Sequence, residues 1–237
     1  MRRVLILLLA ALTIAVAACG DDEETTGSEA GGETTAATET AEAEAPDTGC
    51  KAAEDPAPRE VEERKAPTFR PKKGTTYTWV LATSCGTIEV RLATGRAPKT
   101  TGSIISLTKD GFYDGLSFHR IVDGFVAQGG DPQNSGNGGP GYSITETPPS
   151  DLTYDIGVVA MAKAGNEPPG TSGSQFFIVT GPAAAQALVT PDYALVGRVS
   201  KGLDVVERLG KVPAAPDAEG GRPLEPVVID KATIRES

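Results

Sequence analysis

The sequence predicts a mainly β fold, an antiparallel barrel or sandwich, on three observations. From residue 77 onward, short segments rich in Val, Ile and Thr recur, and several alternate polar and apolar residues as half-buried strands do. Their spacing is irregular and lacks the strand–helix alternation of a parallel sheet. No self-similar repeat of about 20 to 50 residues is present.

The elements follow in order from these patterns. Segments 77–81 and 86–92 are expected to form a hairpin that turns at Ser84-Cys85-Gly86. A helix is expected from Pro98, because proline suits a first helical turn, to a stop at Gly111. A second, short helix is expected at 203–209, and further strands at 116–121, 124–128, 157–162, 174–180, 193–199 and 227–234.

The first 18 residues have the pattern of a signal peptide. Arg2 and Arg3 precede an apolar stretch, Val4 to Ala18, that is too short to span a bilayer comfortably. The stretch ends Val16-Ala17-Ala18-Cys19, which resembles the lipobox of bacterial lipoproteins. This resemblance implies an exported protein anchored to the cell membrane through a lipidated Cys19. An ordinary secretory signal cut nearby is the alternative.

Composition divides the rest of the chain. The net charge is −10, and residues 20–49 alone contain ten carboxylates and no Lys or Arg, so the remainder is nearly neutral. We expect an acidic, disordered linker or tether at 19–49, because it has too few apolar residues to offset chain entropy. An N-terminal extension at 50–74 and one folded domain at 75–237 follow. The charge pattern offers no basic surface for nucleic acid.

The three cysteines are Cys19, Cys50 and Cys85. If Cys19 is lipidated, Cys50 and Cys85 remain, and in an oxidising exported setting a disulfide between them is expected. Two free thiols are the alternative. Their spacing is typical of neither a zinc site nor a CxxC redox motif.

Two motifs carry the functional signal. They are Phe118-His119-Arg120-Ile121-Val122-Asp123-Gly124-Phe125-Val126-Ala127-Gln128-Gly129-Gly130-Asp131 and, downstream, Gly173-Ser174-Gln175-Phe176-Phe177. Together they resemble the cyclophilins, the peptidyl-prolyl cis/trans isomerases. The resemblance spans residues 75 to about 236. It implies a closed eight-stranded antiparallel barrel capped by two helices, acting on X-Pro bonds of proline-containing polypeptides without a cofactor or metal.

The resemblance also implies the site. Arg120 matches the catalytic arginine of the family. The residues expected to bind the substrate are Phe125, Val126, Gln128, Ala162, Lys163, Ala164, Gln175, Phe177, Leu188 and Tyr193. Lys163 stands where the family often has asparagine, Val126 where many relatives have methionine, and Leu188 where many have tryptophan. Because cyclosporin binding in the family depends on that tryptophan, reduced sensitivity is expected here.

Structural roles compete with these assignments. Arg120 could form a surface salt bridge, and Phe125 and Phe177 could be plain core residues, although Phe176 is the better core candidate because neighbours in a strand face opposite ways. His119 is expected to be a buried imidazole bonded to backbone. The run Gly129–Gly141 matches no phosphate-binding motif and is expected to be a surface loop.

Three functions remain open at this stage. The first is a monomeric, exported isomerase that helps secreted proteins fold. The second is a proline-peptide binding module with little turnover. The third is a chaperone that holds unfolded clients at the barrel rim. The sequence does not favour a metal site or a Ser-His-Asp hydrolase, since the chain has one histidine and no GxSxG motif.

Overall fold

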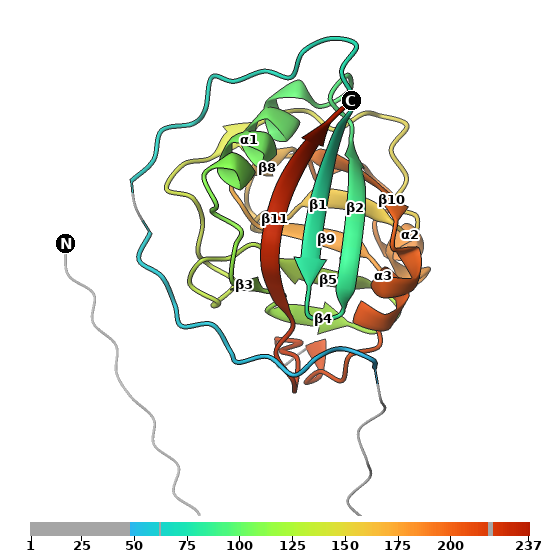
Figure 1. Ribbon diagram of the computed structural model, residues 1–237. Helices are drawn as coiled ribbons and strands as arrows, with labels where there is room; N and C mark the ends of the chain where they lie inside the picture. The colour runs from blue at the N-terminus through green and yellow to red at the C-terminus, as the bar shows by residue number, and fades with distance from the viewer. Residues whose placement is uncertain (1–47, 62, 218–219) are drawn as a thin grey trace, which may run out of the picture. The chain divides into compact units, whose positions relative to one another are not determined.

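Nine antiparallel strands form the main sheet of the structure, a computed structural model that describes residues 48–61, 63–217 and 220–237. The strand order is β3-β11-β1-β2-β10-β7-β9-β5-β4. Figure 1 shows the long strands β11, β1 and β2 side by side. The strands are β1 Tyr77–Thr83, β2 Gly86–Leu92, β3 Leu116–Ser117, β4 Arg120–Val122, β5 Val126–Gly129, β7 Val158–Met161, β9 Phe176–Val179, β10 Leu195–Lys201 and β11 Val228–Glu236. The short strands β6 Ile144–Thr145 and β8 Thr171–Ser172 pair separately.

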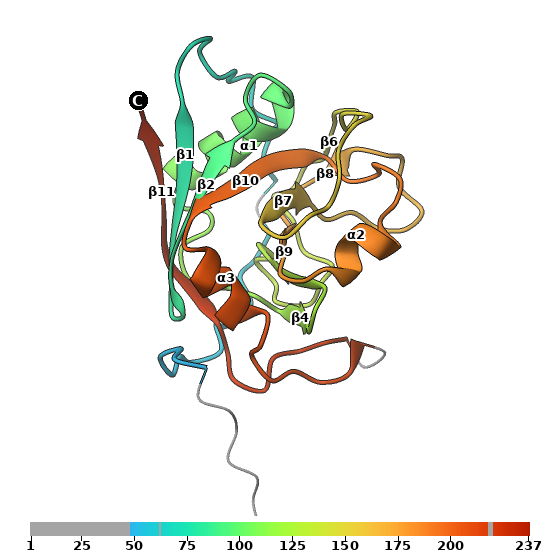
Figure 2. The same cartoon turned by 90° about the vertical axis from the view of Figure 1, so that its right-hand side faces the viewer.

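The predicted mainly β fold is confirmed, but the closed eight-stranded barrel is not. The sheet has nine strands, because the segment predicted as one strand is divided into β3 and β4 by Phe118 and His119. β3 pairs with β11 and β4 pairs with β5, and no ladder joins β3 to β4 within the described part of the chain. The sheet is therefore a curled one whose two edge strands are consecutive in sequence (Figure 2).

Among the described residues, three α-helices accompany the sheet, where two were predicted. Both predicted helices are present, α1 at Pro98–Lys109 and α3 at Leu203–Leu209. Figure 2 shows them toward opposite ends of the curled sheet, and both contribute to the same core, α1 through Ile104 and Ile105 and α3 through Val206. The unpredicted helix, α2 at Ala183–Ala187, is a single alanine-rich turn and follows from the high helix propensity of alanine.

Aromatic side chains fill the core inside the sheet. The Trp79 ring lies 5.1 Å from the Tyr113 ring and 4.8 Å from the Phe176 ring, both in edge-to-face geometry that favours aromatic pairs. Phe176 is fully buried in this core, as predicted. Phe177, its neighbour on β9, belongs instead to a second apolar cluster on the other face. The alternation of the strand thus separates core from candidate site.

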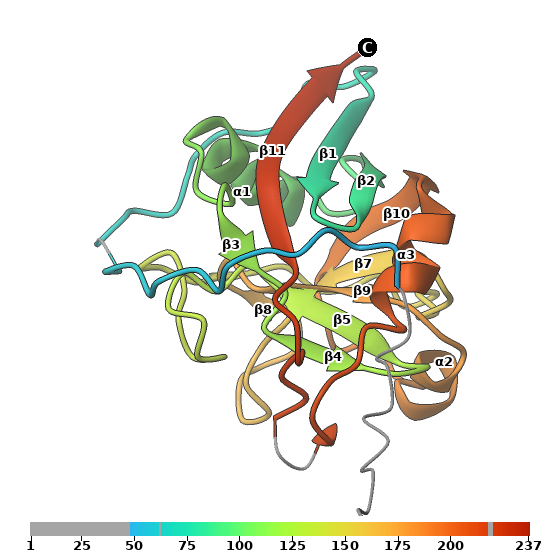
Figure 3. The ribbon, with the colours of Figure 1, turned by 60° about the horizontal axis from the view of Figure 1, so that its bottom comes forward.

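The described residues of the extension, 50–61 and 63–74, form neither helix nor strand, yet they contact the domain at several points. Figure 3 shows it crossing in front of β11. The Lys51 N–H donates to the Ser84 carbonyl at 2.8 Å, and the Arg59 N–H donates to the Pro132 carbonyl at 2.8 Å. Phe69 packs against the core, and Gly102 of α1 leaves room for the carbonyl of that residue, which a Cβ would approach to 2.6 Å.

The signal peptide predicted at 1–18 and nearly all of the linker predicted at 19–49 lie outside the described residues. Within the described ranges, no helix has the length and hydropathy that crossing a membrane requires.

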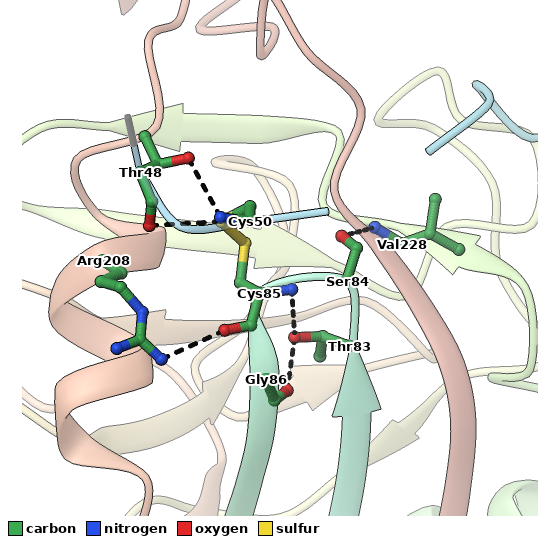
Figure 4. Close-up of a disulfide and its surroundings, with 8 residues drawn as sticks. All are labelled: Thr48, Cys50, Thr83, Ser84, Cys85, Gly86, Arg208 and Val228. Carbon is green, nitrogen blue, oxygen red and sulfur yellow. Dashed lines mark hydrogen bonds between the residues drawn. A yellow bond between two sulfur atoms is a disulfide. The ribbon is translucent and has the colours of Figure 1, made fainter. Parts of the chain in front are cut away.

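A disulfide joins Cys50 to Cys85, the pair expected from the sequence, and ties the extension to the β1–β2 turn (Figure 4). The Cys85 carbonyl also accepts a hydrogen bond from Arg208 of α3 at 3.3 Å. The disulfide and this hydrogen bond therefore connect the extension, the β1–β2 hairpin and α3 around Cys85.

Replacing both Cys50 and Cys85 by serine should lower the free energy of unfolding by about 2–4 kcal/mol, because the cross-link restricts the unfolded chain. Urea denaturation of the oxidised protein and the double variant measures this difference. Adding a reductant should shift the wild-type midpoint and leave that of the double variant in place. Equal midpoints for the two oxidised proteins would contradict the expectation.

Candidate active site

Strand register brings three of the predicted site residues into one row. Arg120 of β4 lies opposite Gln128 of β5, and Gln128 lies opposite Phe177 of β9. On the other side of β9, Phe177 lies opposite Ala160 of β7. Directly paired residues of antiparallel strands present their side chains to the same face. The cation, the amide and the aromatic ring therefore lie next to one another, although they are far apart in sequence.

A chain of polar contacts runs along this row. The Arg120 Nη1 donates to Gln128 Oε1 at 3.4 Å, and the Gln128 amide donates to Gln175 Oε1 at 2.9 Å. Gln175 in turn donates to the carbonyls of Gly136 and Gly138 at 2.9 and 2.8 Å. Each amide is thereby held in one orientation, which leaves Arg120 facing a fixed acceptor.

The glycine-rich run is a loop, as expected, but it also contributes to the site through those two carbonyls. Asp131 organises it by accepting the backbone N–H groups of Gln133, Ser135 and Gly136 at 2.5 to 2.9 Å. Burial alone would raise the pKa of Asp131, but these backbone donors outweigh it and lower the pKa. The carboxylate stays ionised and keeps the loop against Gln175.

Aromatic rings form an apolar cluster beside the row. The Tyr193 ring stands perpendicular to the Phe177 ring, with centroids 5.2 Å apart, and Tyr154 lies 6.0 and 6.2 Å from these two rings. Val126, Phe125 and Leu188 pack in the same cluster, Val126 and Phe177 being buried and the others partly exposed. The sequence did not point to Tyr154, whose hydroxyl accepts the Tyr193 N–H at 2.9 Å.

Lys163 lies against the Tyr193 ring of this cluster. Its side chain is only 3% exposed, its ammonium lies 2.8 Å from the Asp192 carboxylate, and the same group lies 5.6 Å from the Tyr193 ring centroid. The backbone N–H of Ala162 is bonded to Gln175 and that of Ala164 to Glu167. The Lys163 N–H has no partner in the described part of the chain, so it can serve a bound peptide.

The predicted residues thus fall into two adjoining groups. Gln128, Gln175 and the rim 162–164 line a pocket of about 390 Å³ together with the glycine loop. Phe125, Val126, Phe177, Leu188 and Tyr193 belong to the apolar cluster. Arg120 is joined to both groups through Gln128, which pairs with Arg120 on one side and with Phe177 on the other.

The structure also tests the structural roles that the sequence suggested for Arg120 and His119. Arg120 does form an ion pair, with Asp217 at 2.8 Å, in addition to its contact with Gln128. His119 is buried, as expected, but both of its ring nitrogens lack a hydrogen-bond partner among the described residues, so the expected bond to backbone is not present. Burial is the main cause that lowers the pKa of His119, which keeps the ring neutral near pH 7.

Comparisons with known proteins agree with this geometry. Residues 78–234 match the family model described as cyclophilin type peptidyl-prolyl cis-trans isomerase/CLD. Peptidyl-prolyl cis-trans isomerase B of Streptomyces anulatus is 37% identical over 172 residues, which cover 65% of this chain and 94% of that protein. Its namesake in Bacillus subtilis is 42% identical over 123 residues, which cover 52% of this chain and 82% of that protein.

A solved structure gives the same result. The cyclophilin type isomerase of Cryptosporidium parvum, crystallised in the presence of the dipeptide Ala-Pro, superposes with a TM-score of 0.60 at 27% identity. The match covers 68% of this chain and 99% of that one. The chain therefore belongs to the cyclophilin family and is a peptidyl-prolyl cis-trans isomerase.

Proposed function

We propose that this isomerase acts on X-Pro bonds of exported polypeptides, with Arg120 as the catalytic cation, and works while anchored to the cell membrane. The observation that supports the catalytic part is the row of Arg120, Gln128 and Phe177 beside an apolar cluster. The cluster offers apolar and aromatic side chains to a proline ring, and the rim can bind the peptide backbone.

The reaction needs little more than these groups. Rotation about an X-Pro bond is opposed by a barrier of about 18–20 kcal/mol, which arises from the double-bond character of the C–N bond. Twisting the bond localises a lone pair on the prolyl nitrogen. A guanidinium that donates to this nitrogen stabilises the twisted state more than either planar isomer, and that difference lowers the barrier.

Substrate recognition in this account combines the apolar cluster with a backbone rim. The ion pair of Lys163 with Asp192 and the packing of its ammonium over Tyr193 hold one side of the cluster, so the lysine is a structural part of it and not a free surface charge. Leu188 contributes a smaller apolar surface than a tryptophan would. This difference supports the expectation that cyclosporin binds only weakly. Short peptides still have Phe177 and Tyr193 to contact.

Replacing Arg120 by alanine should reduce the isomerisation rate at least 100-fold, because the stabilising cation is removed from the twisted state. Replacing it by lysine should restore little, since an ammonium cannot reproduce the planar fork. The measurement is cis/trans exchange of an Ala-Pro peptide by NMR. Arg198→Ala, at an exposed arginine paired with Asp155, is the matched control and should retain full activity. Full activity in Arg120→Ala would contradict the catalytic role, and binding without exchange in the wild type would favour a binding module.

The proposed location rests on the sequence of the first 49 residues and gains support from the disulfide. The small residues before Cys19 fit lipidation, and two acyl chains suffice for lasting attachment where one is marginal. The Cys50–Cys85 bond is of the kind that persists outside the reducing cytosol. The acidic linker would then hold a monomeric domain away from an anionic lipid surface.

Replacing Cys19 by serine in the full chain should release the protein from membranes, because the acylated side chain is lost. Partitioning into Triton X-114, with metabolic labelling by a radioactive fatty acid, measures the change. Wild type should label and enter the detergent phase, and Cys19→Ser should do neither. Cys50→Ser is the control and should still label. Labelling that persists in Cys19→Ser would rule out this anchor.

A further inference from the structure

A loop between α3 and β11 is fastened against the strand that carries Arg120. Residues 213–217 and 220–224, here named the C-terminal loop, are closed at the base by the Leu224 N–H, which donates to the Pro213 carbonyl at 2.8 Å. The Ile121 N–H donates to the Gly221 carbonyl at 2.7 Å and so joins the loop to β4. Figure 3 shows the chain after α3 passing beside β4.

Gly221 brings the loop close to the arginine itself. Its φ is +61°, in the left-handed region that favours glycine, and a Cβ there would lie 3.2 Å from the Arg120 Cγ. Arg222, the next residue, forms an ion pair with Asp55 of the extension. The loop is thus held from both sides against the Arg120 side chain.

Asp217, in the C-terminal loop, contacts the Nε–Nη2 edge of the Arg120 guanidinium. Its Oδ1 accepts a hydrogen bond from Arg120 Nε at 2.9 Å and lies 2.8 Å from Nη2 in the ion pair. Gln128 accepts from Nη1 at 3.4 Å. Of the five N–H groups, one on Nη1 and the two on Nη2 form no hydrogen bond with the part of the chain that the structure describes, although Nη2 lies close to the Asp217 carboxylate. These groups remain available to a substrate.

We propose that Asp217 is a positioning residue that fixes the plane of the Arg120 guanidinium for isomerisation. The inference rests on the proposed catalytic role of Arg120. Asp217 holds the Nε–Nη2 edge and Gln128 the Nη1 side, so the remaining donors point in one direction. A guanidinium held in this way need not lose rotational freedom when it meets the twisted peptide bond.

The opposite role, in which Asp217 masks the charge of Arg120, is weaker on physical grounds. The Asp217 side chain is 52% exposed and that of Arg120 is 25% exposed, so water and salt screen the pair. Exposed pairs of this kind change an equilibrium by less than about 5-fold. A shift of roughly 1 Å in a catalytic group can cost about 100-fold, so orientation outweighs masking.

Three variants separate these roles. Asp217→Ala should lower kcat about 10-fold with KM unchanged, because the edge contact is lost while the apolar cluster stays intact. Asp217→Asn should stay within about 3-fold of wild type, since the amide oxygen can still accept from Nε. Asp123→Ala is the matched control: this nearby carboxylate pairs with Lys211, and its loss should leave kcat unchanged.

The rates are measured by NMR exchange on an Ala-Pro peptide, together with the ¹⁵N–¹H signal of Arg120 Nε, assigned by its disappearance in Arg120→Lys. This signal should be sharp in wild type and Asp217→Asn and broadened in Asp217→Ala, which a purely structural role would not produce. Wild-type kcat in Asp217→Ala, or a raised kcat in both Asp217 variants, would overturn the positioning role. Full activity in Arg120→Ala would overturn the proposed function itself, and an inactive Arg120→Ala beside a fully active Asp217→Ala would overturn the positioning alone.

Discussion

The register of three neighbouring strands is the constraint on which the site depends. Because Arg120 of β4 lies directly opposite Gln128 of β5, and Gln128 lies directly opposite Phe177 of β9, their side chains share one face of the sheet. A shift of one residue in either pairing would turn Arg120 toward the core and bring His119 to the surface. On the opposite face of the sheet, Phe176 packs edge-to-face against Trp79 in the core. A shift in register is disfavoured because the shift would expose these large aromatic rings to water.

Around this row, segments from distant parts of the chain hold the side chains of the candidate site from outside the sheet. The extension is tied to the β1–β2 turn by the disulfide and to the C-terminal loop by the ion pair of Asp55 with Arg222. That loop reaches Arg120 through Asp217, and the glycine loop reaches Gln175 through its carbonyls. A continuous series of contacts therefore runs from the disulfide through the extension and the C-terminal loop to Arg120.

The sequence predicted those features that depend on local pattern. Strand alternation separated Phe176 from Phe177, and the positions of Pro98 and Gly111 predicted α1 nearly to its ends. Contacts between distant residues had no local signal: Asp217 lies 97 positions from Arg120. The split between β3 and β4 and the unpartnered ring of His119 also depend on packing, whereas α2 did have a signal in its alanines.

The central claim is that a proline ring enters the cluster of Phe177, Tyr193 and Val126 beside Arg120. Intermolecular nuclear Overhauser effects between a bound Ala-Pro peptide and the ¹³C-labelled protein test it most directly. The account predicts contacts from the prolyl ring protons to the Phe177 and Tyr193 rings and to the Val126 methyl groups. Contacts confined to another surface, such as that around the exposed Leu224, would contradict it.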